Sequence, residues 1–168
     1  MSNNLDIFRN DFLGANSWAQ RKDGVPLYLL DTLTIEELKV AEIELMKAAN
    51  LSDTWPIIGL GHIKSQNALP LLYKLLSKSK KNTRITIAHA IFQIAQDQKM
   101  FDIVLDEIPK INNQYELIDM LYMLPDFKDP RITELLKRFQ EHKEYLVAYN
   151  ATRALGLPTD EIVKKFRK

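Results

Sequence analysis

The sequence predicts an all-α protein built as a right-handed α-solenoid of about four antiparallel helix pairs, with a capping helix at each end. Three observations predict this fold class. Apolar residues recur in steps of three along several segments, which places them on one face of a helix. The pattern returns with a period of about thirty residues, and short polar links separate its copies. Because neither helix of a pair can bury its apolar face alone, stacked pairs would share one continuous core.

The repeat aligns twenty-four positions, and all of them are apolar although hydrophobic residues make up only 46% of the chain. We therefore predict that these positions form the core. On the first helix of each pair they are Leu38, Leu69, Phe101 and Ile132, then Ala41, Leu72, Val104 and Leu135, then Leu45, Leu76, Ile108 and Phe139. On the second helix they are Ile57, Ala88, Ile118 and Ala148, then Leu60, Ile91, Leu121 and Ala151, then Ile63, Ile94, Leu124 and Ala154.

Length and capping signals set the expected boundaries. At 168 residues the chain is long enough for one sizeable core, so we expect a single domain. Thr34 with Glu37 forms a capping-box pattern at the start of the first pair, and Asp129 precedes a proline at the start of the last. The expected segments are an N-terminal cap at 1–33, antiparallel helix pairs at 34–63, 64–95, 96–126 and 127–157, and a C-terminal cap helix at 158–168.

Residues 1–33 do not follow the repeat. The apolar pattern of residues 5–13 predicts a short amphipathic helix, and Gly24 indicates a turn. One interpretation is a cap that covers the open end of the solenoid. The other is a partner-binding arm that uses Trp18 and Phe12, because aromatic side chains are enriched at binding hot spots.

Motifs in the first two pairs carry a resemblance to a known family. Residues 58–63 end a helix with two glycines and an isoleucine, residues 68–72 begin the next with an alanine–leucine–proline motif, and residues 84–95 start with an arginine. With these motifs the chain resembles the HEAT-repeat family, in particular its short-repeat branch related to bilin lyases, over about residues 34–157. The resemblance implies that the second helix of each pair lines a concave face. It implies chromophore chemistry only at the level of the family, since one fold hosts many functions.

The composition excludes several classes of site. The chain contains no cysteine, which excludes disulfides, thiolate zinc sites and a cysteine nucleophile. Its five glycines form no phosphate-binding loop, and no G-x-S-x-G motif is present. The first residues lack the pattern of a secretory signal, and no apolar run is long enough to cross a bilayer. We expect a cytoplasmic protein without a cofactor, a metal site or a membrane partner.

Charge alternates along the chain although the net charge is only +1. Residues 64–95 carry a net +6, whereas residues 34–63 and 96–126 carry −3 and −5. Residues 1–33 carry −1 and residues 127–168 carry +4. Stacked repeats would turn this order into bands of charge, which either pair with one another or steer charged protein partners.

We expect the outward positions of the second helices to form a binding surface. These positions mix aromatic, aliphatic, acidic and basic side chains, which is typical of a protein-binding groove. For Trp55 an alternative is packing onto the N-terminal segment at Pro26 or Leu29. The predicted partner-binding residues are Trp55, His62, His89, Gln93, Glu116, Asp119, Met123, Tyr149 and Arg153. The other outward positions of the second helices are Ile58, Thr86 and Leu146.

Two other classes of function remain open. In a lyase-type enzyme acting on a small molecule, His89 beside Glu116 or Asp119 would form a general acid–base pair. A metal enzyme is disfavoured, because His62, His89 and His142 lack the spacing of a zinc motif. A nucleic-acid-binding protein, similar to the HEAT-like DNA glycosylases, needs basic residues along the concave face. Glu116 and Asp119 occupy the centre of that face instead.

The pattern therefore favours a non-catalytic protein-binding HEAT-repeat module. A more specific hypothesis is a bacterial immunity protein, a toxin inhibitor that neutralises its cognate toxin by binding a toxin domain in the concave groove. Small, cysteine-free, single-domain proteins with banded charge suit this role. The expected partner is another protein, and neither a nucleic acid nor a membrane.

Overall fold

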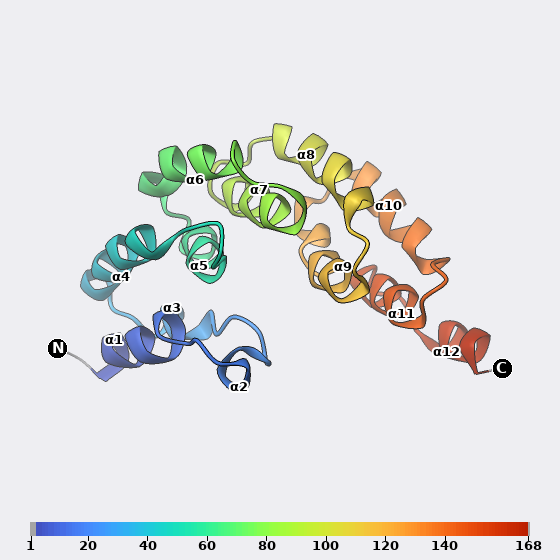
Figure 1. The fold of residues 1–168 in the computed structure, drawn as a ribbon, viewed down its shortest axis with the longest axis horizontal. Helices are drawn as coiled ribbons and strands as arrows, with labels where there is room; N and C mark the ends of the chain where they lie inside the picture. The colour runs from blue at the N-terminus through green and yellow to red at the C-terminus, as the bar shows by residue number, and fades with distance from the viewer. Residues whose placement is uncertain (1–2, 168) are drawn as a thin grey trace. The chain divides into compact units, whose positions relative to one another are not determined.

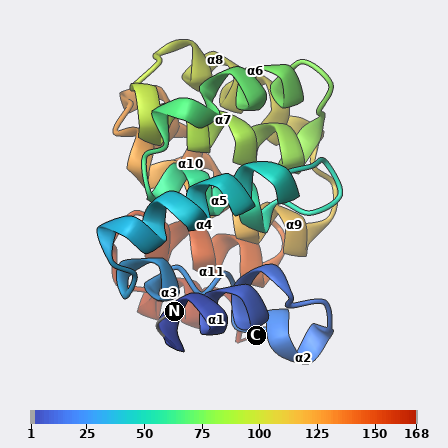
Figure 2. The same cartoon turned by 90° about the vertical axis from the view of Figure 1, so that its left-hand side faces the viewer.

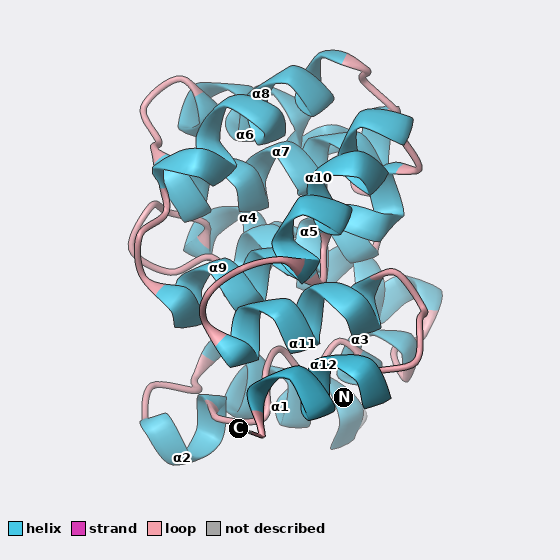
Figure 3. Ribbon diagram, turned by 90° about the vertical axis from the view of Figure 1, so that its right-hand side faces the viewer, coloured by secondary structure: helices cyan, strands magenta, loops and turns pink. Residues whose placement is uncertain are grey.

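The computed structural model describes residues 3–167, and this part of the chain contains helices and loops but no strand (Figures 1 and 3). Helical residues make up 72% of it. The predicted all-α class is confirmed, whereas the right-handed solenoid of HEAT-like pairs stays a prediction. The α-helices are α1 (Asn3–Ile7), α2 (Trp18–Arg21), α3 (Tyr28–Asp31), α4 (Ile35–Ala48), α5 (Trp55–His62), α6 (Leu69–Leu76), α7 (Lys81–Ala95), α8 (Lys99–Glu107), α9 (Gln114–Leu121), α10 (Pro130–Gln140), α11 (Tyr145–Ala154) and α12 (Asp160–Phe166). Short π- or 3₁₀-helical segments are η1 (Phe8–Leu13), η2 (Gln66–Ala68), η3 (Ile108–Lys110) and η4 (Leu124–Phe127).

The chain divides into two compact units. Unit 1 comprises Met1–Ser79 and Ala90–Asp97, and unit 2 comprises Lys80–His89 and Gln98–Lys168. Helix α7 therefore contributes its first turns to unit 2 and its last turns to unit 1. Each of the four segments predicted to form a helix pair contains two α-helices. The organisation of the chain as one domain stays a prediction.

None of the predicted core positions is exposed, and most of them are buried. Of the twenty-four positions, seventeen are buried and the other seven are half-buried. The half-buried positions are Leu38, Ile63, Leu69, Ile118, Leu135, Phe139 and Ala154. Several of these lie at helix ends, where fewer neighbouring turns cover them.

The capping chemistry read from the sequence is confirmed at its main positions. The Thr34 side chain accepts a hydrogen bond from the Glu37 backbone N–H, and the Glu37 carboxylate accepts one from the Thr34 backbone N–H at 2.9 Å. Asp129 accepts from the Arg131 backbone N–H at 2.7 Å and begins α10. Gly24 has a φ of +85°, which only glycine adopts without strain, at the predicted turn.

In unit 1, α4 and α5 lie side by side, and glycine allows the close packing of α5 (Figure 2). A Cβ atom at Gly59 would lie 3.0 Å from the Phe12 ring and 3.1 Å from Leu45. A Cβ atom at Gly61 would lie 3.0 Å from the Cα of Ala90. Both glycines of the motif thus serve close approach between packed elements, and not a special backbone conformation.

In unit 2, helix α11 packs against both α9 and α10. Ala148 and Ala151, two of the predicted core alanines, are both 0% exposed. Protein interiors are closely packed, so a residue larger than alanine would not fit at these buried positions without a shift of its neighbours. The α11 helix therefore forms the central scaffold of this unit.

The first turn of α7 depends on a carboxylate from another helix of unit 2. Helix α7 begins at Lys81 and has no acidic residue in its first turn. Glu107 of α8 is 5% exposed and accepts a hydrogen bond from the Lys81 backbone N–H at 2.8 Å. The Lys110 ammonium lies 3.1 Å from the same carboxylate. Glu107 thus satisfies a free N–H group and places negative charge at the positive end of α7.

Candidate functional site

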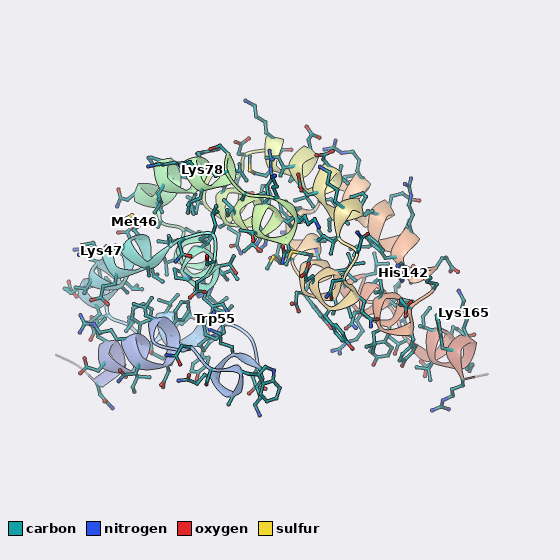
Figure 4. The ribbon with its side chains drawn as sticks, viewed as in Figure 1. Met46, Lys47, Trp55, Lys78, His142 and Lys165 are labelled. Atoms are coloured by element: carbon teal, nitrogen blue, oxygen red, sulfur yellow. The ribbon has the colours of Figure 1, made fainter. Side chains whose placement is uncertain are left out.

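Trp55, the first residue of α5, lies between this helix and the N-terminal segment (Figure 4). It is 8% exposed, its ring meets Phe12 edge-on at 5.9 Å between centroids, and the Arg21 guanidinium lies 4.4 Å from the ring centroid. The expectation of an exposed aromatic anchor is therefore wrong at this position, whereas the alternative of packing onto the N-terminal segment is observed, through Phe12 and Arg21. Residues outside the repeat cover the ring, so the helical register alone did not predict its environment.

Arg21 fastens the N-terminal segment to the loop before α5. Its two terminal nitrogens lie 3.0 and 2.7 Å from the two carboxylate oxygens of Asp53, and its Nε donates to the Ala15 carbonyl at 2.8 Å. Burial opposes ionisation of Asp53, but the hydrogen bonds from Arg21 and from the Trp55 backbone N–H outweigh it and lower the pKa of this carboxyl. The hydrogen bonds to Asp53 raise the pKa of Arg21 in turn.

His62 and Gln93, two predicted partner-binding residues, make contacts inside unit 1. The His62 Nε2 lies 2.7 Å from a carboxylate oxygen of Asp31, and the His62 side chain is 31% exposed. The Gln93 side chain lies so close to α5 that its Oε1 would be 2.5 Å from a Cβ atom at Gly61. Both side chains are half-buried.

His89 is buried, which corrects its predicted place on an exposed face. It is 7% exposed, its Nε2 lies 2.8 Å from Asp126 Oδ2, and its ring meets Phe127 at 5.4 Å between centroids. The carboxylate that pairs with His89 is therefore Asp126, and not Glu116 or Asp119. The hydrogen bond from His89 outweighs burial and lowers the pKa of Asp126. Segment η4 brings Asp126 to this position, which the helical repeat did not reveal.

Five predicted residues lie on two neighbouring helices of unit 2 or, for Met123, in the turn that follows α9. Glu116 and Asp119 are exposed on α9, Arg153 is exposed on α11, and Met123 and Tyr149 are half-buried. Helix α9 packs directly against α11 (Figure 3), and we therefore treat these side chains as one surface. We call it the α9–α11 face and define it by Glu116, Asp119, Tyr122, Met123, Leu146, Tyr149 and Arg153.

The acidic part of the α9–α11 face lacks a compensating cation. Burial raises the pKa of the Asp119 carboxyl, and repulsion from Glu116 one turn earlier raises it further. Among residues 3–167, no ion pair involves either carboxylate. Two like charges one helical turn apart destabilise a helix slightly. This part of the surface is therefore less favourable in the free protein than it would be beside a positive charge.

The apolar part of the face includes a residue that sequence reasoning missed. Tyr122 is 50% exposed, and its hydroxyl donates a hydrogen bond to the Asn150 side chain, which joins α9 to α11. Leu146 is 40% exposed on the adjacent helix, and Asn150 donates to its carbonyl at 2.7 Å. The spacing of three residues from Asp119 to Tyr122 was the signal that could have placed this tyrosine on the face.

Two kinds of site are absent from the part of the chain that the structure describes. No group of three or more His, Asp or Glu side chains there is arranged to hold a metal ion. No helix between residues 3 and 167 combines the length and the apolar character needed to cross a membrane. The α9–α11 face is consequently the strongest candidate site, because it combines charged and apolar side chains on a rigid base.

Comparisons with known proteins add no relative to this picture. No protein-family model, no curated protein and no solved structure matches the chain.

Proposed function

We propose that the chain is a non-catalytic protein-binding module of HEAT-like helix pairs and that the α9–α11 face contacts its partner. The observation that carries the proposal is the combination, on two packed helices, of exposed apolar side chains with carboxylates that have no cation. Neither feature stabilises the free protein. Both become favourable when a complementary surface covers them.

The apolar side chains supply the area that a protein interface requires. Tyr122 and Leu146 are 50% and 40% exposed, and the half-buried Tyr149 is on α11 with Leu146. Tyrosine combines a large apolar ring with a polar hydroxyl, and it is enriched at the centres of interfaces. The hydrogen bond between Tyr122 and Asn150 holds one ring in place before binding, which lowers the entropy cost of association.

The carboxylates indicate the charge of the partner. A lysine or arginine brought next to Asp119 and Glu116 would offset the desolvation and the repulsion from Glu116 that together raise the pKa of Asp119. Arg153 on the same face would meet an acidic group of the partner. We therefore expect a partner surface that is basic where it faces α9, with apolar side chains beside the basic group.

A more specific form of the proposal is a cytoplasmic bacterial immunity protein that binds and neutralises a toxin domain. It is supported by the small, cysteine-free chain with alternating charge. The buried pairing of His89 with Asp126 leaves the face without a histidine for general acid–base chemistry, which favours binding over catalysis.

The test is a quantitative pull-down from lysate of the source organism, read by mass spectrometry. Tagged wild type is compared with a face variant that carries Asp119→Lys and Leu146→Glu. A matched control variant carries Glu134→Lys and Ile43→Glu, which make the same charge changes at exposed positions of α10 and α4. Circular dichroism melts of all three proteins check that each is folded.

The proposal predicts one protein at near-equimolar amount with wild type and with the control variant, and its loss with the face variant. Coexpression with the captured protein then tests the immunity form, which predicts relief of growth inhibition. A partner retained equally by all three proteins would overturn the role of the face. Salt-sensitive retention of nucleic acid, without a protein partner, would overturn the proposal in favour of nucleic-acid binding.

A further inference from the structure

Unit 1 contains a second surface feature that the proposed function does not use. A hollow of 370 Å³ lies on the N-terminal segment, between η1, α2 and the loop before α3. Asp11, Asp23 and Tyr28 are among the residues that line it, and Tyr28 is 66% exposed. Val25 and Pro26 contribute half-buried apolar surface.

The basic residues of the N-terminal segment form no ion pair with the acidic residues of this hollow in the described chain. Arg9 pairs with Glu44 at 2.6 Å, and Arg21 pairs with Asp53 at 2.7 Å. Lys22 is the remaining basic residue of the segment, is exposed, and forms no ion pair in the described chain. The same part of the chain shows no ion pair for either carboxylate of the hollow. Negative charge therefore remains uncompensated at a concave, partly apolar site.

The walls of the hollow are held in place before any ligand binds. Ser17 and Gln20 form a reciprocal capping box at the start of α2. Arg21 ties the end of α2 to Asp53, and the positive φ of Gly24 sets the turn that follows. A site that is already ordered loses less conformational entropy on binding than a flexible loop does.

We propose that this hollow binds an arginine side chain of a partner peptide. The guanidinium forms charge-assisted hydrogen bonds with the carboxylates of Asp11 and Asp23. Its flat face stacks on the Tyr28 ring, and its aliphatic stem packs on Val25 and Pro26. Arginine suits the site better than lysine, because only its planar group combines several directed donors with stacking.

The site is independent of the α9–α11 face, because all of its residues belong to unit 1. Its test therefore uses a readout that assigns binding to individual residues. Isotope-labelled protein is titrated with the peptide acetyl-Gly-Arg-Gly-amide, and backbone amide shifts are followed by NMR. The same peptide with lysine, or with the neutral arginine analogue citrulline, replaces it in parallel titrations.

We expect the arginine peptide to cause saturable amide shifts that are confined to residues 11 and 20–28. Relative to the arginine peptide, the affinity should be at least tenfold lower for the citrulline peptide and several-fold lower for the lysine peptide. The variant with Asp11→Asn and Asp23→Asn should lose at least tenfold in affinity, and Tyr28→Leu should lose about threefold. A charge-matched control with Glu36→Gln and Asp160→Asn, both exposed acids on other helices, should bind as wild type does.

Three results would overturn the assignment. Equal weakening by the control variant would show general electrostatic attraction. Equal binding of the citrulline peptide would show that the charge is not recognised. Shifts centred on Glu116 and Asp119 would place arginine binding on the α9–α11 face, which would support the proposed function while removing this second site.

Discussion

Asp53 in unit 1 and Asp119 in unit 2 are both carboxylates that burial opposes in the charged form, yet their pKa values shift in opposite directions. Asp53 receives two nitrogens of Arg21 and a backbone N–H, so its pKa falls. Asp119 has Glu116 as its neighbour, so its pKa rises. A carboxylate that is paired with a cation of its own fold indicates a structural role. A carboxylate without such a pair on an exposed face indicates a surface suited to a partner.

The largest expected effect on stability comes from removing Arg21, the cation that pairs with Asp53. Arg21→Ala removes the ion pair with Asp53, the hydrogen bond to the Ala15 carbonyl and the contact with the Trp55 ring. We expect a loss of roughly 2–3 kcal/mol in the free energy of unfolding, measured by urea denaturation. The exposed Arg131, which pairs with Asp102 and Asp129, provides the control, and Arg131→Ala should cost much less. Equal losses for the two variants would contradict the structural role of Arg21.

The scaffold beneath the α9–α11 face provides the next test. Ala151 is 0% exposed, so Ala151→Leu should overpack the contacts of α11 and lower the free energy of unfolding by roughly 1–3 kcal/mol in a thermal or urea melt. The half-buried Ala154, one turn later on α11, should tolerate leucine with a smaller loss. An unchanged melt for Ala151→Leu would mean that α11 is not packed as described.

The pH dependence of stability tests the structural role of the Asp53 carboxylate. Because the folded pKa of Asp53 lies below its ordinary value of 3.8, its contribution is present at neutral pH and is lost as the pH falls below 3.8. Asp53→Asn should therefore cost about 1 kcal/mol at pH 7 and progressively less in acid. Urea melts at pH 7 and pH 3 measure the difference. If the destabilisation caused by Asp53→Asn grew as the pH fell, it would contradict the lowered pKa of Asp53.

The smallest effect is expected at Asp119, and it has the opposite sign. Its folded pKa lies above 3.8, so the ionised carboxyl destabilises the fold at neutral pH, and protonation removes this penalty as the pH falls towards 3.8. Asp119→Asn should raise the free energy of unfolding by roughly 0.2–0.5 kcal/mol at pH 7 and by less in acid. The same substitution should weaken partner binding. If Asp119→Asn were less stable than wild type, a group within the fold would have to stabilise the charged Asp119 carboxylate.

Local chemistry explains what the sequence predicted well. A capping box such as Thr34 with Glu37 joins residues three apart, and an apolar stripe fixes which side of each helix is buried. For α9 and α11 this was enough to place Glu116, Asp119 and Arg153 on the outside, since the helices lie side by side. The prediction succeeded where the environment of a side chain depends on its own helix and the next.

The prediction failed where the environment depends on the N-terminal segment or on a short segment between helices, and not on two neighbouring helices. Trp55 has the register of an exposed position, but Phe12 and Arg21 come from the N-terminal segment, which does not follow the repeat, and cover it. His89 meets Asp126 across 37 positions of sequence, through the short segment η4. The hollow on residues 11–28 arises from the path of a loop, and the hydropathy of that loop does not encode its shape.

The dependence of α7 on Glu107 has a consequence for synthesis on the ribosome. The chain emerges from its N-terminus, so Lys81 leaves the exit tunnel well before Glu107, which follows it by 26 residues. Until then the first turn of α7 has no acidic residue to offset its positive end. We expect this turn to remain frayed in the nascent chain and to become fixed once α8 has emerged. The start of unit 2 would then acquire its structure only after a later part of the chain has been translated.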